Sequence, residues 1–229
     1  MERRRRSLKK KSVEIKFTES IIPTVPQESF LANEKNKSRL ITMLVSRLNE
    51  ANIATKQAFE DADKWIVETA ISLAPDYEKV AVVGEDVDLL VIMIGTSTPS
   101  NVFFLKPGEN KIPPSVYHSP TVMDSDIAEH MLFLHAISGC DSTSALYKQG
   151  KLKCIKVLKK NPDLLPHLSL FRDPSSDQQK IIEAGEKFLV ALYGGDYKQA
   201  IINKLRFKEY LSSAYKISTN LASLPPTLL

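Results

Sequence analysis

A short apolar run that ends in a glycine and a group of acids constrains this chain more than any other feature. Residues 80–83 contain only valine and alanine, Gly84 follows them, and Glu85, Asp86 and Asp88 come next. The apolar run predicts a strand buried on both faces of an α/β sheet. Binding sites in such sheets collect beyond the carboxyl ends of the strands, and a cation stabilises carboxylates that cluster there. The stretch therefore indicates a cation site, with a solvated acidic turn as the alternative interpretation.

Composition predicts an ordinary globular protein in a reducing compartment. The chain has 229 residues, of which 43% are hydrophobic and 25% are charged, which suits one domain of moderate size. The longest apolar run, residues 89–94, is far too short to span a membrane. Cys140 and Cys154 are the only cysteines, too few for a disulfide framework or a zinc knuckle. We expect an intracellular protein with no membrane partner.

Positive charge is concentrated at the start of the chain. Residues 1–11 hold seven basic residues and one acid, although the whole chain has a net charge of only +4. Such a run is typical of a nuclear-import signal, a nucleic-acid tether or a solvated arm. We expect a basic tail over residues 1–20, a core with the acidic site over residues 21–165, and a helical extension over residues 166–229.

Apolar periodicity and turn residues predict the remaining elements. The stretch 89–94 is short enough to be a helix or a strand, and the proline-rich stretch 106–120 is expected to be a loop. The expected strands are 13–17, 80–83 and 102–105, and the expected helices are 36–50, 60–73, 124–138, 148–160, 177–192 and 198–215.

Two further segments bring acids to positions where helices are expected to begin. Asp61 and Asp63, with Glu60 beside them, lie in the first turn of the helix predicted over 60–73, and Asp141 follows Gly139 directly. Acids at helix starts are also favoured by the helix dipole or serve as caps without any catalytic role. Both interpretations stay open for each segment.

Lysines follow the last of these acids. The stretch 148–160 contains six lysines and no acid, which predicts either a surface that holds a polyanion beside the acidic site or a solvated helix face. His130 and His135 are five residues apart and so lie on different faces of a helix. We interpret them as structural residues and not as a metal-binding pair.

The three acidic segments, in this order and spacing, resemble the flap-endonuclease branch of the PIN-like 5′-nuclease superfamily. The likeness is greatest to a multi-copy invertebrate group within it, and it extends over roughly residues 20–227. The matching stretches are Asp61-Ala62-Asp63, Glu85-Asp86-Val87-Asp88, Gly139-Cys140-Asp141 in the run from His135 to Ser144, and Leu224-Pro225-Pro226-Thr227.

The resemblance implies a mostly parallel sheet flanked by helices, a helical carboxyl-terminal region, and hydrolysis of phosphodiesters in DNA or RNA. Two Mg²⁺ or Mn²⁺ ions, about 3.5–4 Å apart, would activate water and stabilise the attacking and leaving oxygens. The implied metal ligands are Asp61, Asp63, Asp86, Asp88 and Asp141, with Glu60 as a substitute for Asp61. Asp86 and Asp88 are also the implied catalytic residues. The residues implied to bind nucleic acid are Lys148, Lys151 and Lys153.

One departure from the family pattern leaves two alternatives open. The family supplies two more acids from its first strands, and this chain begins at about the place where those strands have ended. We therefore expect the first strand or strands to be missing and the domain to be incomplete or degenerate. A non-catalytic nucleic-acid-binding module is one alternative. A haloacid-dehalogenase-like phosphatase is the other, because Asp86 and Asp88 also fit its Asp-x-Asp signature after a strand.

Overall fold

The computed structural model describes residues 13–18, 20–22, 24–58, 62–109, 112–140, 143–199, 201–214 and 220–227. The chain divides into two compact units, Met1–Ala62 and Asp63–Leu229. This division falls inside the stretch 21–165 that we expected to form one core. Each unit is described by itself.

The first unit is an extended segment held against two helices, α2 (Gln27–Leu31) and α3 (Glu34–Glu50). Asn33 caps α3 by accepting hydrogen bonds from the backbone N–H groups of Lys35 and Asn36. Residues 13–17, expected to form a strand, have no strand partner among the described residues. They run along α3 instead.

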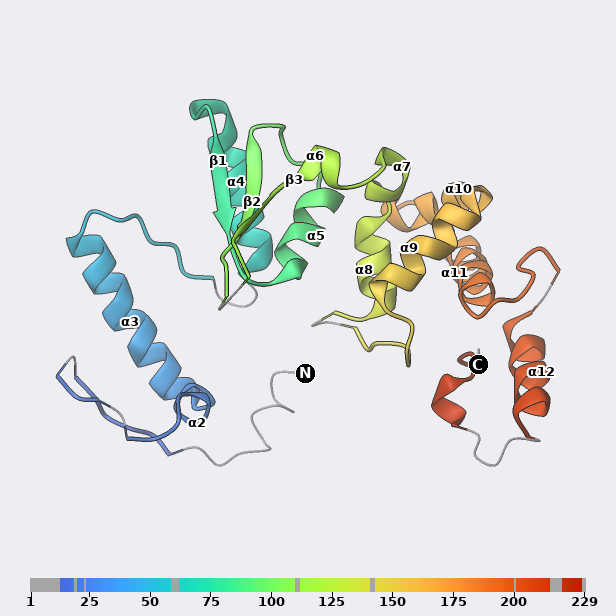
Figure 1. Cartoon of the computed structure of the whole chain (residues 1–229), viewed down its shortest axis with the longest axis horizontal. Helices are drawn as coiled ribbons and strands as arrows, with labels where there is room; N and C mark the ends of the chain where they lie inside the picture. Colours follow the sequence, from blue (N-terminus) through green and yellow to red (C-terminus); the bar gives the residue numbers. More distant parts are fainter. Residues whose placement is uncertain are drawn as a thin grey trace. The chain divides into compact units, whose positions relative to one another are not determined.

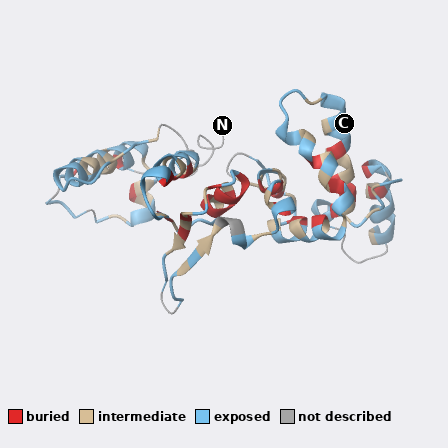
Figure 2. Ribbon diagram, turned by 90° about the horizontal axis from the view of Figure 1, so that it is seen from above, coloured by how far each residue is buried: buried red, intermediate tan, exposed pale blue. Residues whose placement is uncertain are grey.

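The buried amide of Asn36 and the guanidinium of Arg39, which donates a hydrogen bond to the Ile15 carbonyl at 2.6 Å, hold this segment against α3. Asn36 is fully buried, accepts a hydrogen bond from the Ile15 N–H at 2.8 Å and donates to the carbonyls of Val13 and Phe30. The ring of Phe17 packs edge-on against that of Phe30, with centroids 5.0 Å apart. Asn36 is the only fully buried residue of α3, which Figure 2 shows almost entirely in tan and pale blue.

The second unit contains a three-stranded sheet in the order β1 (Val80–Val83), β2 (Val102–Lys106) and β3 (Ser115–His118). β1 and β2 are parallel, whereas β2 and β3 are antiparallel. The expectation of a mostly parallel sheet is therefore wrong: the fold is α/β with a mixed sheet. β3 lies in the stretch expected to be a loop. Its two preceding prolines, Pro113 and Pro114, are compatible with a strand at the sheet edge.

Only one face of the sheet is buried. Val82, Val102 and Phe104 are at most 4% exposed and pack with α4 (Asp63–Leu73) and α5 (Val87–Gly95) in the main core. On the opposite face, Val83 and Val116 are 58% and 65% exposed. The prediction that β1 is buried on both faces is therefore wrong, because these helices pack on one side of it.

The helix α4 buries the face that carries Val67 and Ala70. Two of its other apolar residues, Trp65 and Leu73, are 41% and 40% exposed. The apolar residues of this helix form two overlapping arcs, and contact with β1 and α5 selects the arc through Val67.

Helices that follow the sheet complete the core of the second unit (Figure 1). The helix expected over 124–138 is two shorter ones, α7 and α8. Phe188, from the stretch expected to form a separate extension, lies in the same core as Leu134 and Leu158, and all three are fully buried. The helices are α6 (Ser119–Val122), α7 (Ser125–Ala128), α8 (Met131–Ser138), α9 (Lys151–Lys160), α10 (Leu165–Leu168), α11 (Gln178–Leu192) and α12 (Ile202–Ala214), with 3₁₀ turns at Ala74–Asp76, Pro162–Leu164, Ser169–Arg172 and Leu221–Ser223.

Within the described part of the chain, no helix combines the length and the apolar character needed to cross a bilayer.

Candidate functional site

Asp86 begins α5 at the carboxyl end of β1. Its backbone is extended, and its side-chain Oδ1 accepts a hydrogen bond from the backbone N–H of Asp88 at 2.9 Å. This is the geometry of an N-cap, which satisfies one of the free N–H groups at the start of the helix. Asp86 is exposed, so its capping role leaves the second carboxylate oxygen accessible from solvent.

Asp88, in the first turn of α5, meets residues from two distant helices. Its Oδ1 lies 3.4 Å from Nζ of Lys151 and 3.8 Å from Nδ1 of His135. The three side chains are only partly accessible, with Asp88 26%, Lys151 30% and His135 14% exposed. Because water screens the pair incompletely, the carboxylate and the ammonium attract each other more strongly than a pair on an open surface does.

Lys151 also fixes the turn that follows α8. Its Nζ donates a hydrogen bond to the carbonyl of Gly139 at 3.4 Å. Gly139 has φ +99°, and a Cβ there would lie 2.5 Å from Cβ of Ala145, so a larger residue is disfavoured both by strain and by space. The Thr143 hydroxyl donates to the carbonyl of Ala136 at 2.6 Å. The turn is thus anchored on both sides of Asp141, which itself lies outside the described residues.

Asp63 is the first residue of α4. This helix packs on β1 and runs in the opposite direction, so that its amino end lies at the same end of the sheet as the carboxyl end of β1 (Figure 1). Asp63 therefore belongs to the end of the sheet where Asp86 and Asp88 lie. Glu60 and Asp61 lie outside the described residues.

The three lysines predicted to bind nucleic acid do not share one face. Lys148 lies in a turn with φ +56°, and its Nζ is 5.3 Å from the centroid of the Tyr147 ring. Lys151 is the first residue of α9 and contacts Asp88. Lys153, two residues further on, points about 200° away from Lys151 around the helix. Of the predicted acids that the structure describes, Asp88 is contacted by Lys151 and by neither of the other two lysines.

The carboxylates at this site have the right chemistry for a hard divalent cation, but too few of them come together among the described residues. Carboxylate oxygens are the ligands that Mg²⁺ and Mn²⁺ prefer, and Asp86 and Asp88 supply them. However, the described residues contain no group of three histidine, cysteine, aspartate or glutamate residues that could hold a metal ion. Two of the five predicted ligands, Asp61 and Asp141, are not among the described residues.

His135 is the functional candidate that our interpretation of the histidines missed. His130 and His135 lie in different surroundings, as their spacing in the sequence predicts. His130 is a core residue, whereas His135 lies close to Asp88. His130 is 4% exposed, and this burial lowers the pKa of its imidazole. The signal for His135 was its place at the head of the matching stretch that ends in Gly139-Cys140-Asp141.

No protein-family model, no curated protein and no solved structure matches this chain. The resemblance to the PIN-like superfamily therefore stays a prediction.

Proposed function

We propose that this chain is a PIN-like, nuclease-type domain that binds phosphodiesters of DNA or RNA at the carboxyl end of β1, with Mg²⁺ or Mn²⁺ as its cofactor. Asp88 carries the proposal: one carboxylate from the segment after β1 lies within 4 Å of Lys151 at the start of α9 and of His135 in α8. Residues that are far apart in the sequence thus meet as a partly buried group of opposite charges. This supports a site rather than a solvated turn.

In this proposal the charges at the site have separate tasks. Asp86 and Asp88 would hold the cation, together with Asp63 and the undescribed Asp61 and Asp141. When bound, a divalent cation polarises the phosphate and lowers the pKa of a bound water. Lys151 is close enough to Asp88 to orient its carboxylate, and the buried side of His135 limits access of water to it.

The test is cleavage by the purified full chain with matched neutral variants. Labelled single-stranded DNA, flap DNA and RNA are incubated with Mg²⁺, Mn²⁺ or a chelator. We expect metal-dependent cleavage that Asp86→Asn and Asp88→Asn each abolish. Asparagine caps a helix about as well as aspartate, so Asp86→Asn removes the charge and keeps α5. Asp76→Asn, an exposed acid before β1, is the control for net charge and should cleave like the wild type.

Two results would contradict the proposal. Equal cleavage by the wild type and by Asp88→Asn would identify a contaminating nuclease. Failure of every nucleic acid to bind, with or without metal, would remove both the catalytic and the binding function.

A second candidate function is binding without hydrolysis, and the Lys151 contact favours it. An ammonium group 3.4 Å from Asp88 already supplies a positive charge at this carboxylate, and the described residues provide no three-ligand group. This candidate predicts that the chain binds nucleic acid equally well in the presence of a chelator. The logarithm of the binding constant should fall linearly with the logarithm of the salt concentration, as is typical of lysine–phosphate contacts. It also predicts that the substrates remain intact at any metal concentration.

A further inference from the structure

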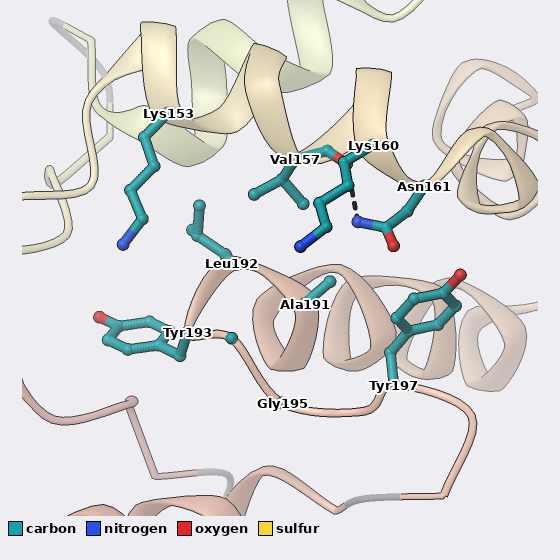
Figure 3. A pocket seen from close by; sticks show the side chains of 10 residues that line it. Lys153, Val157, Lys160, Asn161, Ala191, Leu192, Tyr193, Gly195 and Tyr197 are labelled. Atoms are coloured by element: carbon teal, nitrogen blue, oxygen red, sulfur yellow. Dashed lines mark hydrogen bonds between the residues drawn. The ribbon is translucent and has the colours of Figure 1, made fainter.

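A hollow lies between α9 and the end of α11. Its volume is about 350 Å³, at the lower end of the range for small-ligand pockets. Val157 and Ala191 contribute apolar surface, and Tyr193 and Tyr197 lie at its two ends (Figure 3). Lys153 and Lys160 extend from α9 toward the same space. The pocket thus combines apolar walls, aromatic rings and two cations.

The two lysines are available to an anion. Lys153, Val157 and Lys160 are spaced by four and three residues, so they form one stripe along α9. Among the described residues, the ion pairs of this region use Lys151, Lys159 and Lys198, and no carboxylate lies within ion-pair distance of Lys153 or Lys160. No acid lines the pocket. A ligand with negative charge would therefore meet two positive charges and no opposing one.

One of the two tyrosines, Tyr197, is held in place by a hydrogen bond. Tyr197 donates its hydroxyl proton to Oδ1 of Asp163 at 2.5 Å, and Lys198 lies 3.0 Å from the other oxygen of the same carboxylate. These contacts lower the pKa of Asp163, chiefly through the Tyr197 hydrogen bond. The Tyr197 ring is therefore fixed before a ligand arrives, which reduces the entropy lost on binding.

We propose that this pocket binds a nucleotide, with its phosphate between Lys153 and Lys160 and its base against Val157 and a tyrosine ring. A planar base suits the apolar and aromatic surface, because aromatic side chains stack on bases of any sequence. Phosphate suits paired lysines that lack a carboxylate partner. The nucleotide is either free or an unpaired unit of a nucleic-acid strand, since both present the same chemistry.

This site is distinct from the acidic one. Lys151, which contacts Asp88, and Lys153, which lines the pocket, point about 200° apart around α9. The inference therefore does not depend on hydrolysis at Asp88 and goes beyond the function proposed above.

The experiment measures binding of four probes to the full chain by isothermal titration calorimetry. The probes are adenosine 5′-monophosphate, adenosine, inorganic phosphate and a short single strand with a 5′ phosphate. We expect the monophosphate to bind more tightly than either of its parts. The double variant Lys153→Gln/Lys160→Gln should weaken it at least about tenfold, because a hydrogen bond to a charged group contributes about 1.5 kcal/mol or more and 1.4 kcal/mol is tenfold.

The matched control is Lys156→Gln/Lys204→Gln. It removes two exposed lysines, one of them from the same helix, and neither lines the pocket. We expect its affinity to stay within about twofold of the wild type, because net charge acts weakly on a small ligand at physiological salt. Tighter binding of the strand than of the monophosphate would identify a strand as the source of the nucleotide, and the reverse would identify a free nucleotide.

Three outcomes would overturn the inference. The first is no detectable binding of the monophosphate or the strand. The second is equal affinity for inorganic phosphate and the monophosphate, which would mean that the apolar walls contact no base. The third is equal weakening by the pocket variant and by the control, which would reduce the effect to general charge.

Discussion

The contact between Lys151 and Asp88 makes a quantitative prediction for stability. At 3.4 Å and an effective dielectric constant of about 20, the direct attraction is about 5 kcal/mol. Desolvation and lost side-chain freedom cancel most of it. Exposed pairs contribute about 0.2–1 kcal/mol, whereas breaking a buried pair costs about 3–5 kcal/mol. With Asp88 26% and Lys151 30% exposed, we expect a coupling energy of about 1 kcal/mol.

A double-mutant cycle of Lys151→Met and Asp88→Asn isolates this term. The hydrogen bond from Lys151 to Gly139 is lost both in the single lysine variant and in the double variant, so it cancels in the cycle. Urea unfolding followed by Trp65 fluorescence reports on this unit, because Trp65 is the only tryptophan of the chain and lies in α4. A coupling energy below about 0.3 kcal/mol, within the error of additivity, would refute the contact.

The same contact predicts competition between Lys151 and a divalent cation. A Mn²⁺ ion at Asp88 would share the negative charge of this carboxylate with the ammonium group and repel it. Lys151→Met should then bind Mn²⁺ about fivefold more tightly, the equivalent of about 1 kcal/mol, and Asp88→Asn should bind it more weakly than the wild type. Titration followed by electron paramagnetic resonance measures the free ion directly. Weaker Mn²⁺ binding by Lys151→Met would show that the lysine does not compete for this carboxylate.

Substitutions at four further positions test the local structure. Gly139→Ala should destabilise the fold by about 1–3 kcal/mol in urea unfolding, because Gly139 has a positive φ and the Cβ of Ala145 lies close to it. Gly185 lies in α11, where an added Cβ would make only an ordinary contact, so Gly185→Ala should stabilise the fold by up to about 1 kcal/mol. Asp86→Ala should lose about 1 kcal/mol with the cap of α5, and Asp86→Asn less. Burial lowers the folded-state pKa of His130, so the unfolded chain binds the proton first and stability should fall as pH drops below about 6.5; His130→Gln should flatten this slope in urea midpoints measured across pH.

Elements with a strong local signal could be predicted from the sequence. The valine-rich run gave β1 at its observed bounds, and Asp177 caps α11 by accepting a hydrogen bond from the Lys180 N–H. Asp86 likewise caps α5. These features depend on neighbouring residues alone, since a cap or a β-branched run acts within one turn or strand.

Elements set by distant contacts could not be predicted. β3 follows Pro113 and Pro114, which indicate a loop when read locally, and it forms because β2 offers a free edge. The break between α7 and α8 has no glycine or proline to mark it. Both helices pack on α9, so the position of that helix sets the break. Neither the free edge of β2 nor the position of α9 can be deduced from the residues next to β3 or to the break.

The candidate site divides in the same way. The acids after β1 were predictable because Gly84 and the strand before it define the end of the sheet. The contact of Asp88 with His135 and Lys151 was not, since it depends on how α8 packs against α5 and how α9 packs against α8. Helical periodicity separates Lys151 from Lys153 by about 200°, but it does not show which of the two faces Asp88.

The division of lysines around α9 determines how the two proposed sites combine. Lys151 is bound to Asp88 on one side of the helix, whereas Lys153 and Lys160 lie over the pocket on another. Side chains that share no partner should contribute independently to binding. The losses of nucleic-acid affinity caused by Lys151→Met and by Lys153→Gln/Lys160→Gln should therefore add on a free-energy scale when one strand reaches both sites. If the strand reaches only the pocket, Lys151→Met should have no effect, and the acidic site would then act on a different ligand.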